Sequence, residues 1–234
     1  MENKNIKNLN DEEKFALFYG IMLGDGCLSQ YKSKYGSNGY AVSITCSYKD
    51  DQEFFKEIVL PLTIFIRGKS INIKQRPKKG TIELNFNDKE LFGKLKNYFP
   101  VGKKGKDLKI SNFFYEKNLI KFVLQGFFAT DGSIVLTKNP NKLYPRLEAH
   151  VIHKKLIEQF YLYMTNLGFK GHMYECKRIK QESRWNVQDR YRFQFNGRDN
   201  LNLFHEKIGF VNPKHEKKYQ DFINKNKVMA IPGV

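Results

Sequence analysis

The chain has 234 residues, 41% of them hydrophobic and 15% aromatic, which is enough for one large domain or two packed halves. No run approaches 18 apolar residues and the first residues lack an apolar stretch, so the pattern argues against a membrane span and a secretory signal. Lysine and arginine outnumber acidic residues by 41 to 24, and the net charge of +17 favours a polyanionic partner such as nucleic acid over a ribosome or membrane surface.

The first half begins with a helix whose start is marked by Asn10 as cap and Glu13 three residues later. Its apolar body ends abruptly at Asp25-Gly26. Alternating and helical spacing predict the elements that follow. They are a strand at 42–47, a helix over 50–66 kinked by Pro61, strands at 70–74 and 81–86, and a helix over 88–98.

The second half repeats this order. A second apolar helix, over 113–130, ends at Asp131-Gly132. The elements expected after it are a strand at 147–151, a helix over 156–167, strands at 173–179 and 190–196, and helices over 200–208 and 213–226. We therefore expect an α+β fold of two αββαββα halves related by a pseudo-two-fold axis. The halves are 1–100 and 113–234, joined by a basic linker at 101–112.

The two aspartates lie 106 residues apart, each at the C-terminal end of an apolar helix. A carboxylate there adds to the negative end of the helix dipole, so its position is electrostatically unfavourable. Because this unfavourable placement occurs twice, we expect the two carboxylates to lie side by side. Binding of a divalent cation is the usual reason for such a pair. Small residues at a spacing of four would let the two helices approach closely: Gly20, Gly24, Gly126 and Thr130.

Segments 18–26 (FYGIMLGDG) and 124–132 (LQGFFATDG) resemble the motif of the LAGLIDADG homing endonucleases, in the single-chain form that carries two motifs. The acidic position is intact in both copies. The departures from the family's letters fall where the family tolerates change: Tyr19, Met22 and Leu23 in the first copy, Gln125 and Thr130 in the second.

The resemblance implies a site-specific, metal-dependent DNA endonuclease. Such an enzyme hydrolyses one phosphodiester in each strand across the minor groove and leaves short 3′ overhangs. Oxygen ligands fit Mg²⁺; we expect Mn²⁺ to substitute and Ca²⁺ to bind without supporting efficient cleavage. The expected metal-site residues are Asp25, Asp131, Gly24 and Thr130.

The resemblance also implies a basic residue near each attacking water. Lys49 and Lys154 occupy like positions in the two halves, shortly after the strand that follows each motif. A solvated lysine at a helix start explains either position equally well, so both interpretations stay open.

The polar faces of the strands and the loops between them are expected to contact DNA, because Arg reads guanine and Asn or Gln reads adenine in the major groove. The partner is double-stranded DNA with a long, partly asymmetric target, bound by a monomer without an obligate protein partner. In the first half the expected contacts are Ser29, Gln30, Tyr31, Lys32, Lys34, Tyr35, Asn38, Ser70, Asn72, Lys74, Arg76, Thr81, Glu83 and Asn85. In the second half they are Lys138, Lys142, Arg146, Glu148, His150, Lys177, Lys180, Gln181, Arg184, Arg190, Arg192 and Gln194.

One alternative is a non-cleaving relative that binds DNA or RNA, such as an intron RNA maturase. Retention of both aspartates argues against it, because a pure binder gains nothing from two repelling carboxylates. The three cysteines, Cys27, Cys46 and Cys176, lack metal-ligand spacing and indicate an intracellular, reducing compartment, either the cytoplasm of a prokaryote or an organelle matrix.

Overall fold

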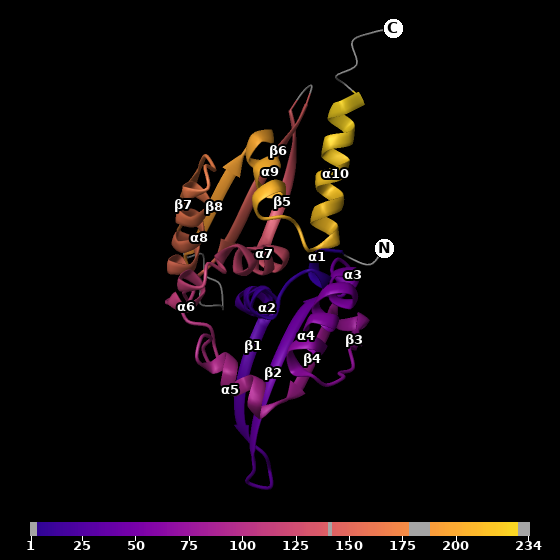
Figure 1. Ribbon diagram of the computed structural model, residues 1–234, viewed down its shortest axis with the longest axis vertical. Helices are drawn as coiled ribbons and strands as arrows, with labels where there is room; N and C mark the ends of the chain where they lie inside the picture. Colours follow the sequence, from indigo (N-terminus) through magenta and orange to yellow (C-terminus); the bar gives the residue numbers. More distant parts are fainter. Residues whose placement is uncertain (1–3, 140–141, 178–187, 229–234) are drawn as a thin grey trace, which may run out of the picture.

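The computed structural model describes residues 4–139, 142–177 and 188–228. Two antiparallel four-stranded sheets lie on opposite sides of a central helix pair, α2 (Asp11–Asp25) and α7 (Ile120–Asp131) (Figure 1). The strand orders are equivalent, β1-β2-β4-β3 and β5-β6-β8-β7. The strands are β1 (Gly26–Lys32), β2 (Asn38–Ser47), β3 (Lys74–Arg76), β4 (Thr81–Asn87), β5 (Gly132–Asn139), β6 (Lys142–Val151), β7 (Gly171–Cys176) and β8 (Arg190–Asn196).

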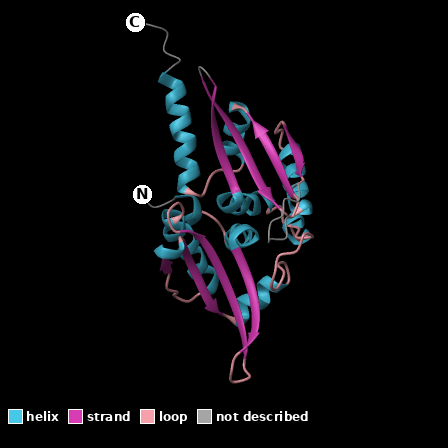
Figure 2. Cartoon of the chain, turned by 180° about the vertical axis from the view of Figure 1, so that it is seen from behind, coloured by secondary structure: helices cyan, strands magenta, loops and turns pink. Residues whose placement is uncertain are grey.

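In each half a helical segment follows the first two strands and a helix follows the last two, which confirms the predicted α+β architecture; η2 and α10 have no counterpart in the other half. Seen from behind, the first strand of each sheet runs outward from the central pair (Figure 2). In the first half the helices are α1 (Lys4–Lys7), α3 (Gln52–Phe54), the π-helical turn η1 (Phe55–Val59), α4 (Leu60–Arg67), the 3₁₀ turn η2 (Pro77–Lys79) and α5 (Lys89–Lys96). In the second they are α6 (Asn112–Glu116), α8 (Lys154–Asn166), α9 (Arg198–Lys207) and α10 (Pro213–Val228).

Helix α2 begins and ends where the sequence predicts. The Asn10 side chain accepts from the Glu13 amide and the Glu13 carboxylate accepts from the Asn10 amide, both at 2.9 Å. Residues 15–23 are all buried, because the helix is covered by the first sheet and by α7. None of the described helices is both long and apolar enough to cross a membrane.

The two central helices touch through their glycines. A methyl group added at Gly20 would lie 2.2 Å from the Val123 carbonyl oxygen, and one at Gly126 would lie 2.1 Å from the Leu17 oxygen. These contacts are reciprocal, so the helices are related by an approximate two-fold axis. The backbones pack at a separation that any larger side chain would prevent.

The structure differs from the predicted elements in three places. The second motif helix is interrupted by Asn118, which has φ of 54°, so α6 and α7 are separate helices. The helix predicted over 50–66 is divided into α3, the π-helical turn η1 and α4, with Pro61 in the first turn of α4. The strand predicted at 70–74 is displaced along the chain: β3 begins only at Lys74 and pairs three residues with β4 before Pro77.

We expect Gly20→Ala to destabilise the protein by about 3 kcal/mol or more, because the new methyl group collides with backbone atoms of α7. The matched control is Gly93→Ala in α5, where no heavy atom lies within 4 Å, and it should be neutral or stabilise by up to about 1 kcal/mol. Urea unfolding measures both. Equal stability of the two variants would contradict the close contact.

His215, at the start of α10, is buried against the rings of Phe128 and Phe210, and burial lowers its pKa to about 3. The unfolded chain, with a histidine pKa near 6.5, takes up this proton first as the pH falls. The contribution to stability is therefore complete above about pH 6.5 and is lost as the pH falls toward 3.

Replacing His215 with leucine should shrink the difference in unfolding free energy between about pH 7.5 and about pH 5 by about 2 kcal/mol. Urea unfolding at the two pH values is the measurement. His172→Leu, at an exposed position on β7, is the matched control. An undiminished pH difference in His215→Leu would show that the histidine is protonated in the folded state.

Candidate active site

Asp25 and Asp131 are the last residues of α2 and α7, and each is followed directly by a glycine that starts a strand. These glycines have extended backbone, so their role is steric. A methyl group at Gly26 would lie 2.5 Å from the Met22 Cα, and one at Gly132 would lie 2.3 Å from the Phe128 ring. Each strand can therefore turn back tightly against the helix that carries the carboxylate.

The helix crossing brings the two predicted carboxylates together. A methyl group at Gly24 would lie 3.2 Å from Asp131 Oδ2 and would overlap Thr130 Oγ1. Burial, followed by the charge of Asp25, raises the pKa of Asp131 to about 6. Burial also raises the pKa of Asp25, against a hydrogen bond from the Cys46 thiol that lowers it. The charged carboxylate form of both residues is thus disfavoured, and a nearby positive charge would stabilise it.

Lys104, in the linker between the halves, supplies such a charge. Its ammonium donates to the carbonyl oxygens of Leu23 at 3.0 Å, Met22 at 3.4 Å and Gly24, at the negative end of α2. Burial lowers the pKa of Lys104, while Asp131 and Asp25 act in the opposite direction. Sequence reasoning missed this residue. The available signal was the basic composition of stretch 101–109, which by itself indicates only a linker.

The linker is held beside the site by the second half. The His153 ring Nδ1 lies 2.8 Å from the Gly105 carbonyl oxygen, and the ring is buried. This contact fixes the residue that follows Lys104.

The second motif helix, α7, has a neutral counterpart of Lys104. The Asn212 amide donates to the Ala129 carbonyl oxygen of α7 at 2.8 Å and to Asp51 Oδ1 of the first half at 3.2 Å. Lys214 Nζ lies 2.6 Å from the same Asp51 oxygen. This cluster joins α10 to the first half beside Asp25, whose pKa the charge of Asp51 raises.

Lys49 and Lys154 lie at like positions, as the duplication predicts, but the structure gives neither a contact with an aspartate. Lys49 is exposed. Lys154 Nζ lies 3.8 Å from Glu158 on its own helix and 5.8 Å from the centre of the Tyr191 ring. Their catalytic role stays a prediction, whereas Lys104 and Lys214 both lie near enough to lower the pKa of Asp25.

The carboxylate and carbonyl oxygen atoms at this site are suited to binding a divalent cation. The described residues contain no group of three or more His, Cys, Asp or Glu side chains able to hold a metal. A cation at Asp25 and Asp131 would therefore take its other ligands from main-chain carbonyls, water and phosphate, as Mg²⁺ and Ca²⁺ do. Of the two other predicted metal-site residues, the Gly24 oxygen accepts from Lys104, and the Thr130 hydroxyl donates to the Phe127 oxygen at 2.9 Å.

The predicted DNA-contacting residues of β4 lie on one face of the first sheet, because they alternate with the buried side chains of Ile82, Leu84 and Phe86. Ser70 and Asn72 precede β3 and do not belong to the sheet. In the second sheet Glu148 faces Gln194, and Arg192 faces His150. The side chains of four predicted residues lie outside the described parts of the chain: Lys142, Lys180, Gln181 and Arg184.

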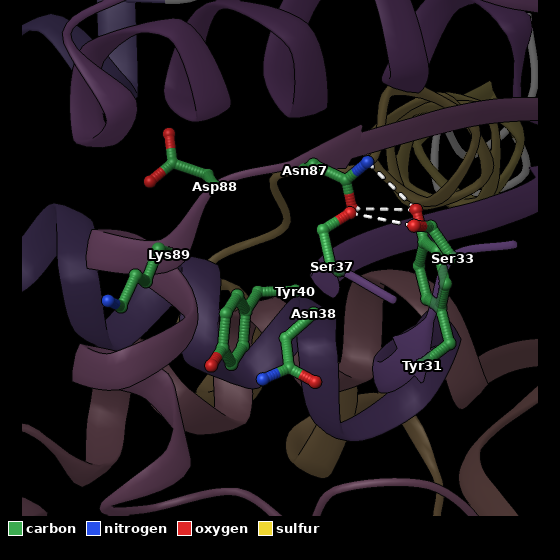
Figure 3. Close-up of a pocket in the computed structure, with 9 residues that line it drawn as sticks. Tyr31, Ser33, Ser37, Asn38, Tyr40, Asn87, Asp88 and Lys89 are labelled. Carbon is green, nitrogen blue, oxygen red and sulfur yellow. Dashed lines mark hydrogen bonds between the residues drawn. The ribbon is translucent and has the colours of Figure 1, made fainter. Parts of the chain in front are cut away.

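A cavity of about 590 Å³ lies at the β1–β2 hairpin (Figure 3). It is lined by Asn38, Lys89 and Tyr31, whose hydroxyl lies 3.1 Å from Asn87 Oδ1. Tyr31 is six residues along the chain from Asp25, or roughly 20 Å of extended strand. The cavity is thus remote from the carboxylate pair and belongs to the far end of the sheet.

Comparison with known proteins agrees with this geometry. The family model described as a LAGLIDADG-like domain matches residues 118–209, which include the second Asp-Gly and the whole second sheet. The model therefore supports the resemblance in the second half of the chain, which carries one of the two motifs.

Three solved structures share the fold over nearly the whole chain. I-DmoI in complex with DNA and Ca is 18% identical, and the match covers 91% of this chain and 100% of the I-DmoI chain, with a TM-score of 0.61. The I-LtrWI LAGLIDADG homing endonuclease bound to target DNA is 14% identical, with coverage of 95% and 92% and a TM-score of 0.60. I-SmaMI bound to uncleaved DNA in the presence of calcium ions is 15% identical, with coverage of 96% and 95% and a TM-score of 0.58.

A curated relative, the "Probable translation initiation factor IF-2" of Methanocaldococcus jannaschii, is 24% identical over 227 residues. The match covers 94% of this chain but only 17% of that protein. The similarity thus concerns a short part of a much longer protein.

We expect Lys104→Met to lower the unfolding free energy by about 2 kcal/mol when measured by urea unfolding in EDTA at neutral pH. The α2 carbonyls lose a charged donor and the two carboxylates lose a nearby cation. Lys103→Met, one residue away and exposed, is the matched control and should change little. Equal stability of the two variants would contradict the role of Lys104 as counter-charge.

Proposed function

We propose that this chain, with its two LAGLIDADG motifs and the matching fold, is a site-specific double-stranded DNA endonuclease. The observation that carries the proposal is the pairing of Asp25 and Asp131 at the adjoining C-terminal ends of two pseudo-equivalent helices. The relatives of known structure are named as DNA complexes with Ca, Mn or Mg, which supports DNA as the partner and a divalent ion as the cofactor.

Asp25 and Asp131, with the neighbouring main-chain carbonyls, would hold the metal. A bound divalent cation supplies an activated water and charge neutralisation at the phosphate. The chain's own residues position the two carboxylates through the glycine contact, and Lys104 keeps positive charge at the junction. The two-fold relation of the carboxylates suits two antiparallel strands, with one phosphodiester hydrolysed in each.

The substrate surface follows from the sheets. Their outer faces carry Arg, Asn, Gln and Thr side chains on both sides of the carboxylate pair, a mixture suited to reading base edges as well as to binding phosphate. We propose a long target whose two half-sites differ, since the two faces carry different residues. Magnesium is the proposed natural ion.

The test is cleavage of a plasmid library with genomic or randomised inserts, in Mg²⁺ and in EDTA. Discrete, magnesium-dependent double-strand cuts support the endonuclease and locate its target. Salt-sensitive binding without cleavage under any divalent ion would overturn it in favour of a non-cleaving nucleic-acid binder such as an intron RNA maturase.

We expect Asp25→Asn and Asp131→Asn each to abolish double-strand cleavage and to leave DNA binding in EDTA nearly unchanged. Both variants should be at least as stable as the wild type without metal, because each removes one of two neighbouring, partly buried carboxylates. Unfolding curves therefore separate loss of chemistry from loss of fold. Loss of DNA binding in both variants would count against the metal role.

The two halves of the site are chemically unequal. On β2, Cys46 lies two residues after the pairing partner of Gly26. On β6, Val151 lies two residues after the pairing partner of Gly132, so the two residues occupy equivalent positions. The donor to α2 is the Lys104 ammonium, whereas the donor to α7 is the neutral Asn212 amide. The proposed enzyme therefore cuts its two strands at different rates.

A time course on supercoiled plasmid carrying the target should show nicked circles accumulating before linear product. Asn212→Lys, which makes the two donors alike, should reduce the fraction that passes through the nicked form. Linear product without a nicked intermediate in the wild type would contradict unequal sites.

A further inference from the structure

Three charged side chains form a cluster on the outer face of the second sheet. Arg146 Nε lies 2.9 Å from Glu148 Oε2, and Arg192 Nη1 lies 3.6 Å from the same oxygen. The side chains are 30%, 17% and 28% exposed in the order Arg146, Glu148 and Arg192. The carboxylate is therefore the most covered member and lies between the two guanidinium groups.

Strand pairing explains the arrangement. Arg146 and Glu148 are two residues apart on β6 and so share one face of the sheet. Arg192 lies on β8 opposite His150, which makes it the diagonal neighbour of Glu148. The Arg192 guanidinium also lies 5.2 Å from the centre of the Tyr174 ring on β7. Arg192 is thus held from two sides.

An acidic residue on this face needs an explanation, because it repels the phosphates that a basic DNA-binding surface attracts. The geometry supplies one: without Glu148 the two guanidinium groups would repel each other and separate. Arg146 Nε, Arg192 Nε and Glu148 Oε2 are buried within the cluster without an aligned hydrogen bond, so the donors open to a ligand lie on the exposed parts of the two arginine side chains. A rigid arginine pair with remaining donors is suited to a planar acceptor such as the guanine O6 and N7 edge.

We propose that Glu148 is a positioning residue that holds Arg146 and Arg192 to read two guanines in the major groove of the half-site under the second sheet. The inference rests on the proposed function only in requiring that the chain binds DNA. The first sheet has a simpler counterpart, in which Arg76 alone pairs with Glu83 at 2.6 Å and is 43% exposed. The guanine preference should accordingly be stronger in the half-site read by the second sheet.

The experiment is selection of bound sequences from a randomised target library, in EDTA or Ca²⁺ so that no cleavage is needed. We compare the wild type with Glu148→Gln and with Arg192→Lys. Glu206→Gln on α9, an exposed residue away from the sheet, makes the same charge change and is the matched control.

Glu148→Gln should bind total DNA as tightly as the wild type or more tightly, while its guanine preference at two positions falls about tenfold or more. Arg192→Lys keeps the charge but loses the fork of donors, so it should lose guanine preference at one of those positions with an unchanged salt dependence. Glu206→Gln should leave every preference unchanged.

Selective binding by the wild type with unchanged guanine preference in both Glu148→Gln and Arg192→Lys would overturn the cluster's role and leave the proposed function standing. Loss of a cytosine preference in Glu148→Gln would also overturn it, because Glu148 would then read a base itself. No selective binding by the folded wild type would overturn the DNA-binding premise and the inference together.

Discussion

The packing of α2 against α7 is the contact on which the rest of the structure depends. Gly20 and Gly126 remove the side chains that would separate the two backbones, and each places its neighbour's carbonyl oxygen within van der Waals reach. The same crossing sets the distance between Asp25 and Asp131 one turn further on. The helices are buried on nearly all sides, so their apolar residues also form the shared core between the sheets.

This arrangement has an electrostatic cost that the fold offsets locally. Two carboxylates lie together at the negative ends of two helices, in an environment that raises the pKa of both. Lys104 and Asn212 satisfy carbonyl oxygens at these helix ends, and Lys214 with Asn212 compensates Asp51 next to the site. Such compensation allows the chain to fold around a charged centre before any cation arrives.

The sequence predicted the architecture well because its signals are local. Duplicated Asp-Gly helix ends, glycine spacing and strand alternation depend on neighbouring residues, and the structure confirms them. Lys104 was missed because its role depends on a linker folding back onto α2, some 80 residues away in the chain. The interruption at Asn118 was missed because the positive φ of this residue is not visible in the alternation of apolar and polar residues.

The residues expected to contact DNA were predictable only by face. Alternation identifies the outer side of β6 and β8, but it does not show that Arg146 and Arg192 converge on one carboxylate, since that requires the strand register. Ser70 and Asn72 lie outside the sheet because pairing between β3 and β4 begins only at Lys74.

The reciprocal glycine contact has an evolutionary consequence. An interface in which each partner presents the same surface to the other is the one that two identical chains form in a symmetric dimer. Joining two such copies by a short linker preserves the shared interface. Residues outside the interface can then differ between the two halves. A strictly symmetric pair would be confined to symmetric ligands, whereas Cys46 against Val151, and Lys104 against Asn212, are positions at which the two halves of this chain differ.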